Sequence, residues 1–148
     1  MKIRDIMTRE VDVLRPEDPV SEAARHMRDR DIGSIPVAED DRLIGMLTDR
    51  DIVIRCIADG AGGDTPIRQA MTDKIRYCYD DQDVDEVCAN MSSEAIRRLP
   101  VVDRDKRLVG IVSLGDISKD NERAAGEAME HIVETPSNGA HQGTLAGL

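Results

Sequence analysis

The feature that most constrains this chain is an internal repeat. The stretch Ile-Arg-Asp-Ile-Met-Thr at residues 3–8 returns as Ile-Arg-Gln-Ala-Met-Thr at residues 67–72, an offset of 64 positions. Ile-Pro-Val at 35–37 and Leu-Pro-Val at 99–101 keep the same offset. From residue 42 onward the offset is 65, so the second copy contains one additional residue. Matching stretches in the same order indicate a duplicated supersecondary unit, and a variable hairpin turn accounts for the insertion.

Each copy has the pattern of a β-α-β-β-α unit. Short β-prone stretches at residues 11–14 and 75–79 open the copies. Apolar residues at i, i+3, i+4 and i+7 then predict a helix with one apolar face. These residues are Val20, Ala23, Ala24 and Met27 in the first copy and Val84, Val87, Cys88 and Met91 in the second. Two apolar strands joined by a polar turn follow, and a second helix begins at Asp49 or Leu114. The predicted fold class is therefore α/β, with two repeats that share one core.

The repeat also predicts the domain boundaries. We expect the first repeat over residues 1–60, a linker over 61–66 and the second repeat over 67–120. The linker reads Ala-Gly-Gly-Asp-Thr-Pro, a composition typical of a loop. We expect residues 121–148 to form one more helix, over 121–133, followed by a mobile tail.

Composition and charge exclude several classes of protein. The formal net charge is −10, which disfavours non-specific binding to the phosphates of DNA or RNA. Tyr77 and Tyr79 are the only aromatic residues, too few for a base-stacking platform. No apolar stretch approaches the roughly 18 residues that a membrane-spanning helix needs. The N-terminus has no apolar signal region. We therefore expect a cytoplasmic protein.

Metal binding and catalysis are not indicated. The three cysteines lack a Cys-x-x-Cys spacing, so neither a disulfide framework nor a zinc site is expected. The three histidines are far apart in the sequence. An enzyme would need a nucleophile with a base, a paired acid and base, or a metal, and no such group of residues is recognisable. We therefore expect no enzymatic activity.

The clearest local motif occurs once in each copy. Gly45 and Gly110 each begin a stretch of the form Gly-apolar-apolar-[Ser/Thr]-x-x-Asp, placed where a strand passes into a helix. The motif has two interpretations. The hydroxyl and the carboxylate three residues later can form a helix capping box. Alternatively, the carboxylate can accept hydrogen bonds from the 2′,3′-diol of a ribose, with a hydroxyl residue beside it and an apolar strand against the base. The second interpretation predicts a nucleoside pocket in each repeat.

Taken together, the repeated opening, the Pro-Val strand and the Gly-x-x-[Ser/Thr]-x-x-Asp closing resemble a tandem pair of cystathionine-β-synthase (CBS) domains, also called a Bateman module. The resemblance covers residues 3 to about 119. It implies two repeats related by pseudo-two-fold symmetry, with clefts that bind AMP, ADP, ATP, NAD or S-adenosylmethionine as regulatory ligands. It also implies a homodimer.

The resemblance further implies roles for particular residues. Asp51 and Asp116 would take the ribose hydroxyls, with Thr48 and Ser113 assisting. The base and phosphate would be lined by Ser34, Ile35 and Pro36 in the first copy and by Arg98, Leu99 and Pro100 in the second.

The two copies differ in their cations. Arg50 precedes Asp51, whereas Gly115 precedes Asp116, and only the second copy has arginine immediately before its Leu-Pro-Val strand. Arginine forms bidentate contacts with phosphate oxygens, so Arg50 and Arg98 are candidate phosphate ligands. We expect clefts of different affinity.

Two other functions remain open at this point. The chain could be a dimeric scaffold with vestigial clefts, whose C-terminal segment contacts a partner. It could also be the regulatory part of a larger complex with a separate effector protein. Binding that depends on Asp51 or Asp116 would distinguish the sensor from the scaffold.

Overall fold

The chain forms two compact units in the computed structural model, which describes residues 1–119 and 129–130. The first-repeat unit is Asp12–Ile75. Among the described residues, the second-repeat unit combines Met1–Val11 with those from Arg76 onward. The opening segment of the first repeat is therefore part of the second-repeat unit. Of the helix and tail expected after residue 120, only residues 129–130, which are helical, lie within the described residues.

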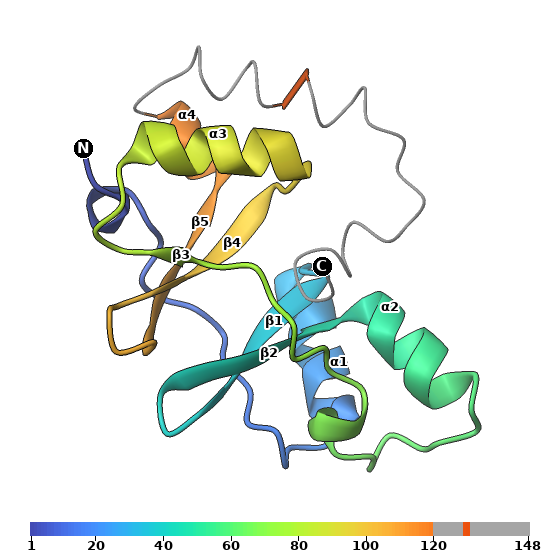
Figure 1. Ribbon diagram of the computed structural model, residues 1–148. Coiled ribbons are helices and arrows are strands. Elements are labelled where there is room, and N and C mark those ends of the chain that lie inside the picture. Colours follow the sequence, from blue (N-terminus) through green and yellow to red (C-terminus); the bar gives the residue numbers. More distant parts are fainter. Residues whose placement is uncertain (120–128, 131–148) are drawn as a thin grey trace. The chain divides into compact units, whose positions relative to one another are not determined.

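The first-repeat unit is a β-hairpin with two helices (Figure 1). Its elements are α1 (Val20–Arg30), β1 (Ser34–Glu39), β2 (Arg42–Thr48), α2 (Asp49–Ile52), the π-helical turn η2 (Val53–Ile57) and the 3-10 turn η3 (Ile67–Gln69). Strands β1 and β2 pair antiparallel, with Ser34 opposite Thr48. Helix α1 contacts β1, and α2 contacts both β2 and α1. A core of ten buried residues, Leu14 and Ile35 among them, holds these elements together.

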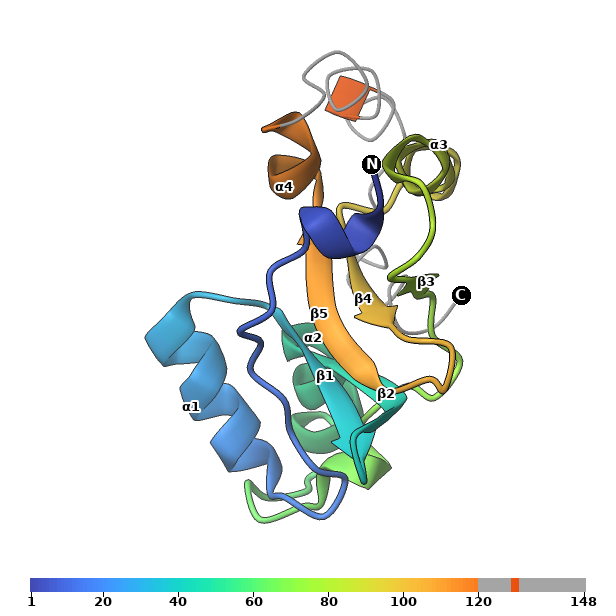
Figure 2. The same cartoon turned by 90° about the vertical axis from the view of Figure 1, so that its left-hand side faces the viewer.

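The second-repeat unit has the same helix-strand-strand-helix order, preceded by a 3-10 turn and a short third strand. Its elements are the 3-10 turn η1 (Ile3–Asp5), β3 (Cys78–Tyr79), α3 (Val84–Glu94), β4 (Arg98–Val102), β5 (Leu108–Ser113) and α4 (Leu114–Ser118). The sheet order is β3-β4-β5, with β3 parallel to β4 and β5 antiparallel to it. In Figure 2 the opening segment runs beside β5, to which Thr8 is bridged through Ile111. Among the described residues, none of the helices is sufficiently long and apolar to traverse a membrane.

The apolar faces predicted for the first helix of each repeat are confirmed, with one correction. All four predicted residues of α3 are buried, namely Val84, Val87, Cys88 and Met91. In α1, Val20, Ala23 and Met27 are buried, but Ala24 is exposed. The apolar stripe of α1 is therefore narrower than the spacing predicts. Alanine has too little apolar surface to require burial on one side of a helix.

The opening strands are shorter than predicted. Over residues 11–14 only Leu14 pairs, in a parallel bridge with Val37, and over 75–79 the strand begins at Cys78. Extending this parallel pairing by two residues toward the start of the opening strand would require a backbone N–H donor at Pro36 in the first repeat and at Pro100 in the second. Proline has no N–H to donate, so the ladder stops there. The backbone just before each strand is consequently left outside the sheet.

Glycine is required where each opening segment crosses a hairpin. The backbones of Thr72 and Met46 exchange two hydrogen bonds of 3.0 Å, and Thr8 pairs in the same way with Ile111. A Cβ atom on Gly45 would lie 2.9 Å from the carbonyl oxygen of Thr72, and one on Gly110 would lie 2.7 Å from that of Thr8. Real Cβ atoms do not approach so closely. The two repeated glycines thus allow the opening segments to pack on the hairpins.

We predict that Gly45→Ala and Gly110→Ala each destabilise the protein by about 1–3 kcal/mol, since the added methyl group forces a backbone shift. Chemical denaturation measures this loss. Gly115→Ala is the matched control: its nearest neighbour would be the Ser113 hydroxyl at 3.5 Å, an ordinary contact. Because alanine is the better helix former, Gly115→Ala should leave stability unchanged or slightly raised. Equal losses in all three variants would contradict the close-approach explanation.

Candidate functional site

A capping box forms at the start of α2, where the sequence motif places Thr48 and Asp51. The backbone N–H of Thr48 donates to Asp51 Oδ2 at 2.9 Å, and the backbone N–H of Asp51 donates to Thr48 Oγ1 at 3.0 Å. Thr48 is fully buried and Asp51 is only 7% exposed. The capping interpretation is therefore confirmed in the first repeat.

The same box forms at the start of α4. The Ser113 N–H donates to Asp116 Oδ2 at 3.0 Å, and the Asp116 N–H donates to Ser113 Oγ at 3.1 Å. An additional contact comes from the opening segment, whose Thr8 hydroxyl donates to Asp116 Oδ1 at 3.4 Å. Both oxygens of Asp116 are thus in contact with protein donors.

The corresponding contact is absent around Asp51, within the part of the chain that the structure describes. Thr72 is the counterpart of Thr8, but its hydroxyl instead accepts a hydrogen bond of 3.1 Å from the Arg55 guanidinium. Arg55 also donates to the carbonyl oxygens of Ala70 and Met71. No buried side-chain oxygen or nitrogen of the described residues lacks a partner. Because Asp51 Oδ1 has none among them, this atom must be reachable from outside.

Strand register brings the remaining predicted residues beside the capping boxes. Ser34 pairs across the hairpin with Thr48, and Arg98 pairs with Ser113. Each box therefore lies next to the first residue of the neighbouring strand. Arg98 is exposed and makes no side-chain hydrogen bond or ion pair within residues 1–119.

The apolar strand residues and Arg50 differ in what they can offer a ligand. Ile35 is fully buried in the first-repeat core, so its side chain is committed to packing. Pro36 and Pro100 are also buried. Arg50 is exposed, and its guanidinium has no partner within the described ranges. Leu99 is 5% exposed and forms part of a cavity wall.

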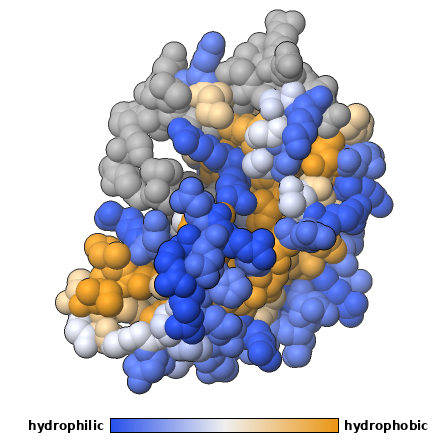
Figure 3. Space-filling view, turned by 180° about the vertical axis from the view of Figure 1, so that it is seen from behind, coloured by the Kyte–Doolittle hydropathy of each residue, from blue (hydrophilic) through white to orange (hydrophobic). Residues whose placement is uncertain are grey.

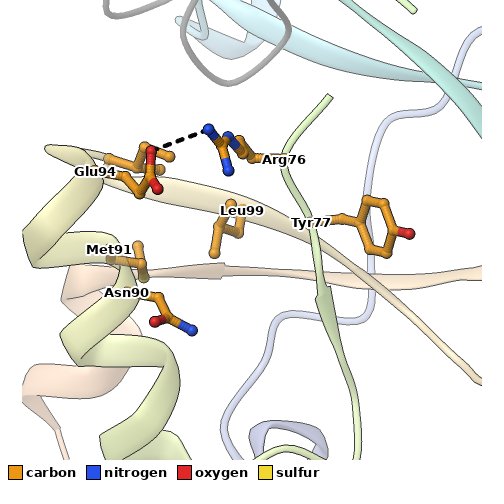
Figure 4. Close-up of a pocket in the computed structure, with 7 residues that line it drawn as sticks. Arg76, Tyr77, Asn90, Met91, Glu94 and Leu99 are labelled. Atoms are coloured by element: carbon orange, nitrogen blue, oxygen red, sulfur yellow. Dashed lines mark ion pairs between the residues drawn. The ribbon is translucent and has the colours of Figure 1, made fainter. Parts of the chain in front are cut away.

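That cavity is located in the second-repeat unit and has a volume of about 280 Å³. Its lining residues are Arg76, Tyr77, Asn90, Met91, Glu94, Ile96 and Leu99. Figure 4 shows Arg76 facing Glu94, with Asn90 and Met91 on the same helix as Glu94, and the ring of Tyr77 directed away from these side chains. The Arg76 guanidinium lies 3.3 Å from Glu94 Oε2. Three apolar side chains (Met91, Ile96 and Leu99) and a polar edge thus surround one space.

Of these lining residues, sequence reasoning singled out only Leu99 as a ligand contact. The residues that it missed are Arg76, Asn90 and Glu94. A usable signal was present, because Asn90 and Glu94 are four residues apart on the polar side of a predicted helix. The opposite charges at positions 76 and 94 do not indicate an ion pair from the sequence alone, because only the fold brings the two residues together.

The thiol of Cys78 is unsuited to nucleophilic chemistry. Burial, with a smaller contribution from the neighbouring Asp80 carboxylate, raises the pKa of Cys78 to about 12. Cys78 therefore remains protonated at neutral pH, and the thiol is a poor nucleophile compared with the thiolate. Residues 1–119 and 129–130 contain no group of three or more His, Cys, Asp or Glu side chains that could hold a metal ion.

Comparisons with known proteins agree with this architecture. The family model described as "CBS domain" matches residues 3–57 and 67–120. The chain is 44% identical over 138 residues to the uncharacterized protein YlbB of Bacillus subtilis, covering 90% of this chain and 92% of that protein. It is 40% identical over 118 residues to hypoxic response protein 1 of Mycobacterium tuberculosis, covering 78% of this chain and 82% of that protein.

Solved structures show the same fold. A crystal structure of Hypoxic Response Protein I with two coordinated zinc ions has a TM-score of 0.70 and 39% identity, covering 80% of this chain and 98% of that one. The CBS domain pair of protein MJ0100, in complex with 5′-methylthioadenosine and S-adenosyl-L-methionine, has a TM-score of 0.66 and 29% identity. It covers 80% of this chain and 94% of that one. The predicted α/β fold with two repeats is confirmed, and this chain belongs to the CBS domain family as a tandem pair of CBS domains.

Proposed function

We propose that this protein is a regulatory module that senses an adenosine-containing ligand and has no catalytic activity of its own. The candidate ligands are AMP, ADP, ATP, NAD and S-adenosylmethionine. The observation that carries the proposal is the reachable oxygen of Asp51 in a carboxylate otherwise fixed by its capping box. The complex of the MJ0100 domain pair with two adenosine derivatives supports it.

The chemistry of the carboxylate suits a ribose diol. An ionised carboxylate has about four lone-pair positions for hydrogen bonds. The Thr48 N–H uses one of them on Oδ2, which leaves positions for both hydroxyls of a ribose. Because the capping box fixes the carboxylate before the ligand arrives, little side-chain entropy is lost on binding. We assign the same role to Asp116, where the ligand would displace the longer bond from Thr8.

The neighbouring residues have supporting roles in this proposal. Ser34 and Arg98 lie beside the two capping boxes, because they pair across the hairpins with Thr48 and Ser113, respectively. Arg98 and Arg50, whose guanidinium groups have no partner among the described residues, would bind phosphate oxygens. Ile35, Pro36 and Pro100 would contribute backbone atoms and shape, since their side chains are buried.

We predict that at least one adenosine-containing ligand raises the melting temperature and that Asp51→Asn or Asp116→Asn reduces the shift. Asparagine can keep the capping hydrogen bond but removes the charge that strengthens bonds to the ribose hydroxyls. A ligand at 100 times its dissociation constant stabilises the folded state by about 2.7 kcal/mol. The assay is a thermal-shift screen of AMP, ADP, ATP, NAD, S-adenosylmethionine and adenosine, with GMP for comparison.

Asp5→Asn provides the matched control for this screen. Asp5 Oδ2 also accepts a backbone hydrogen bond from a residue three positions earlier, the Lys2 N–H at 3.0 Å, but in a different part of the fold. The Asp5→Asn substitution should leave the ligand-induced shift in melting temperature unchanged. A screen in which no adenosine derivative stabilises the wild-type protein would favour the scaffold function instead.

We also propose that the protein is a homodimer formed through an apolar patch on η2, the helical turn that follows α2 in the first-repeat unit. Val53, Ile54 and Ile57 are 54%, 50% and 61% exposed, high values for large apolar side chains. Figure 3 shows apolar side chains gathered at this part of the surface. Apolar side chains clustered on a helix are typical of a surface that another protein covers.

We predict a dimeric mass for the wild-type protein and a monomeric mass for Ile54→Lys in size-exclusion chromatography with light scattering. A charged side chain in the centre of a buried interface would remain unpaired and desolvated. Val13→Lys is the control, because Val13 is 44% exposed but lies away from the patch in sequence. Identical masses for wild type and Ile54→Lys would show that this patch is not the interface.

A further inference from the structure

The apolar patch of the first-repeat unit has no apolar counterpart in the second repeat. Its three exposed side chains, all on η2, are those of Val53, Ile54 and Ile57. The equivalent positions, 65 residues later in the sequence, are occupied by Ser118, Lys119 and Glu122. Of these residues the structure describes the first two, and Lys119 is exposed. Positions that the repeat makes equivalent are therefore apolar in the first copy and polar in the second.

This difference determines which surface of a second copy suits the patch. If the patch packed on the equivalent surface of the second repeat, the ammonium group of Lys119 would lose water against apolar side chains. If the patch instead packed on the same patch of another copy, only apolar side chains would meet at the centre. In a two-fold symmetric dimer both copies use one surface, which must be complementary to itself.

The charges on either side of the patch meet this requirement. Arg50 lies three residues before Val53, and Asp59 lies two residues after Ile57. Arg50 and Asp59 are both exposed, and within residues 1–119 neither side chain forms a hydrogen bond or an ion pair. Two helical segments related by a two-fold axis perpendicular to them run antiparallel. The start of one segment then lies beside the end of the other, which brings Arg50 of each copy to Asp59 of the other copy.

We infer that the first-repeat units of two copies bind each other, with η2 packed antiparallel on η2 and Arg50 paired with Asp59 at both ends of the patch. The inference rests on the proposed homodimer and specifies which surfaces meet. It is compatible with the role proposed for Arg50 in binding phosphate. A guanidinium group has five N–H donors, so it can contact a phosphate and a carboxylate together.

The first test is cross-linking through a cysteine introduced into the patch. Ile54→Cys, treated with a short bis-maleimide, should give a covalent dimer on a denaturing gel, because the same residue of both copies lies near the two-fold axis. The natural cysteines are buried, so the wild-type protein should not be linked. Val13→Cys is the matched control. Val13 is 44% exposed in the same unit but does not belong to the patch, so this variant should also remain unlinked.

A mixture of tagged Ile54→Cys and untagged Lys119→Cys chains tests the alternative arrangement. If the patch met the second repeat, the linked product would contain one chain of each kind, and Ile54→Cys alone would not be linked. That result, or a dimeric Ile54→Cys protein that forms no linked product, overturns this inference but leaves the proposed homodimer standing. A wild-type protein that is monomeric by light scattering overturns both, whereas the proposed ligand binding is tested separately by the thermal-shift screen.

Charge reversal tests the two ion pairs. Arg50→Glu and Asp59→Arg should each raise the dissociation constant of the dimer by about tenfold, because each places like charges together at both ends of the patch. The double variant exchanges the two charges and should return the constant to nearly its wild-type value. Sedimentation equilibrium measures these constants. A double variant weakened by the product of the two single effects would contradict the pairing of Arg50 with Asp59 and overturn the inference.

Discussion

The backbone contact between each opening segment and a hairpin is the constraint on which the rest of the structure depends. Thr72 pairs with Met46 and Thr8 with Ile111, at positions where only glycine leaves enough room in the facing strand. The segment that opens the first repeat thereby becomes part of the second-repeat unit. Neither sequence repeat is a compact unit by itself, so the duplication has produced two units whose chain segments are interleaved. The same contact brings the hydroxyl of Thr8 to the carboxylate of Asp116.

Much of this arrangement was predictable because it depends on local or periodic signals. Helical spacing predicted the buried face of α3, and the two hairpins follow from apolar stretches around polar turns. The capping boxes also follow from a local pattern, since the hydroxyl and the carboxylate are three residues apart. Ala24 shows the limit of periodicity, because spacing alone does not reveal how wide an apolar stripe the fold can cover.

The features that sequence reasoning missed involve residues that only tertiary structure brings together. The exchange of opening segments depends on contacts between residues such as Thr8 and Ile111, which are more than one hundred positions apart in the sequence. The early end of the opening strands results from a missing N–H on a neighbouring strand, at Pro36 and Pro100. That shortening leaves Arg76 outside the sheet and able to reach Glu94. The cavity is thus a consequence of long-range pairing.

The two repeats share one backbone arrangement but differ in the contacts of their polar side chains. Asp116 contacts Thr8, whereas Thr72 is held by Arg55. The first helix contributes Arg30 to an ion pair with Asp12 in one unit, but Glu94 to an ion pair with Arg76 at the equivalent positions of the other. Sites that differ in this way can bind different ligands, or one ligand with different affinities. A regulatory role then requires that the ligand and an effector protein change each other's affinity, because allosteric coupling is reciprocal.

The central claim is that the capping carboxylates have a second role as acceptors for a ribose diol. The most direct test is to compare the binding of adenosine with that of 2′,3′-dideoxyadenosine to the wild-type protein by calorimetry. The two nucleosides share the base and differ in the two hydroxyls, so no substitution in the protein is needed. We predict that the dideoxynucleoside binds at least about tenfold more weakly, because it donates no hydrogen bond to a charged acceptor. Equal affinities would contradict the claim and would limit Asp51 and Asp116 to capping their helices.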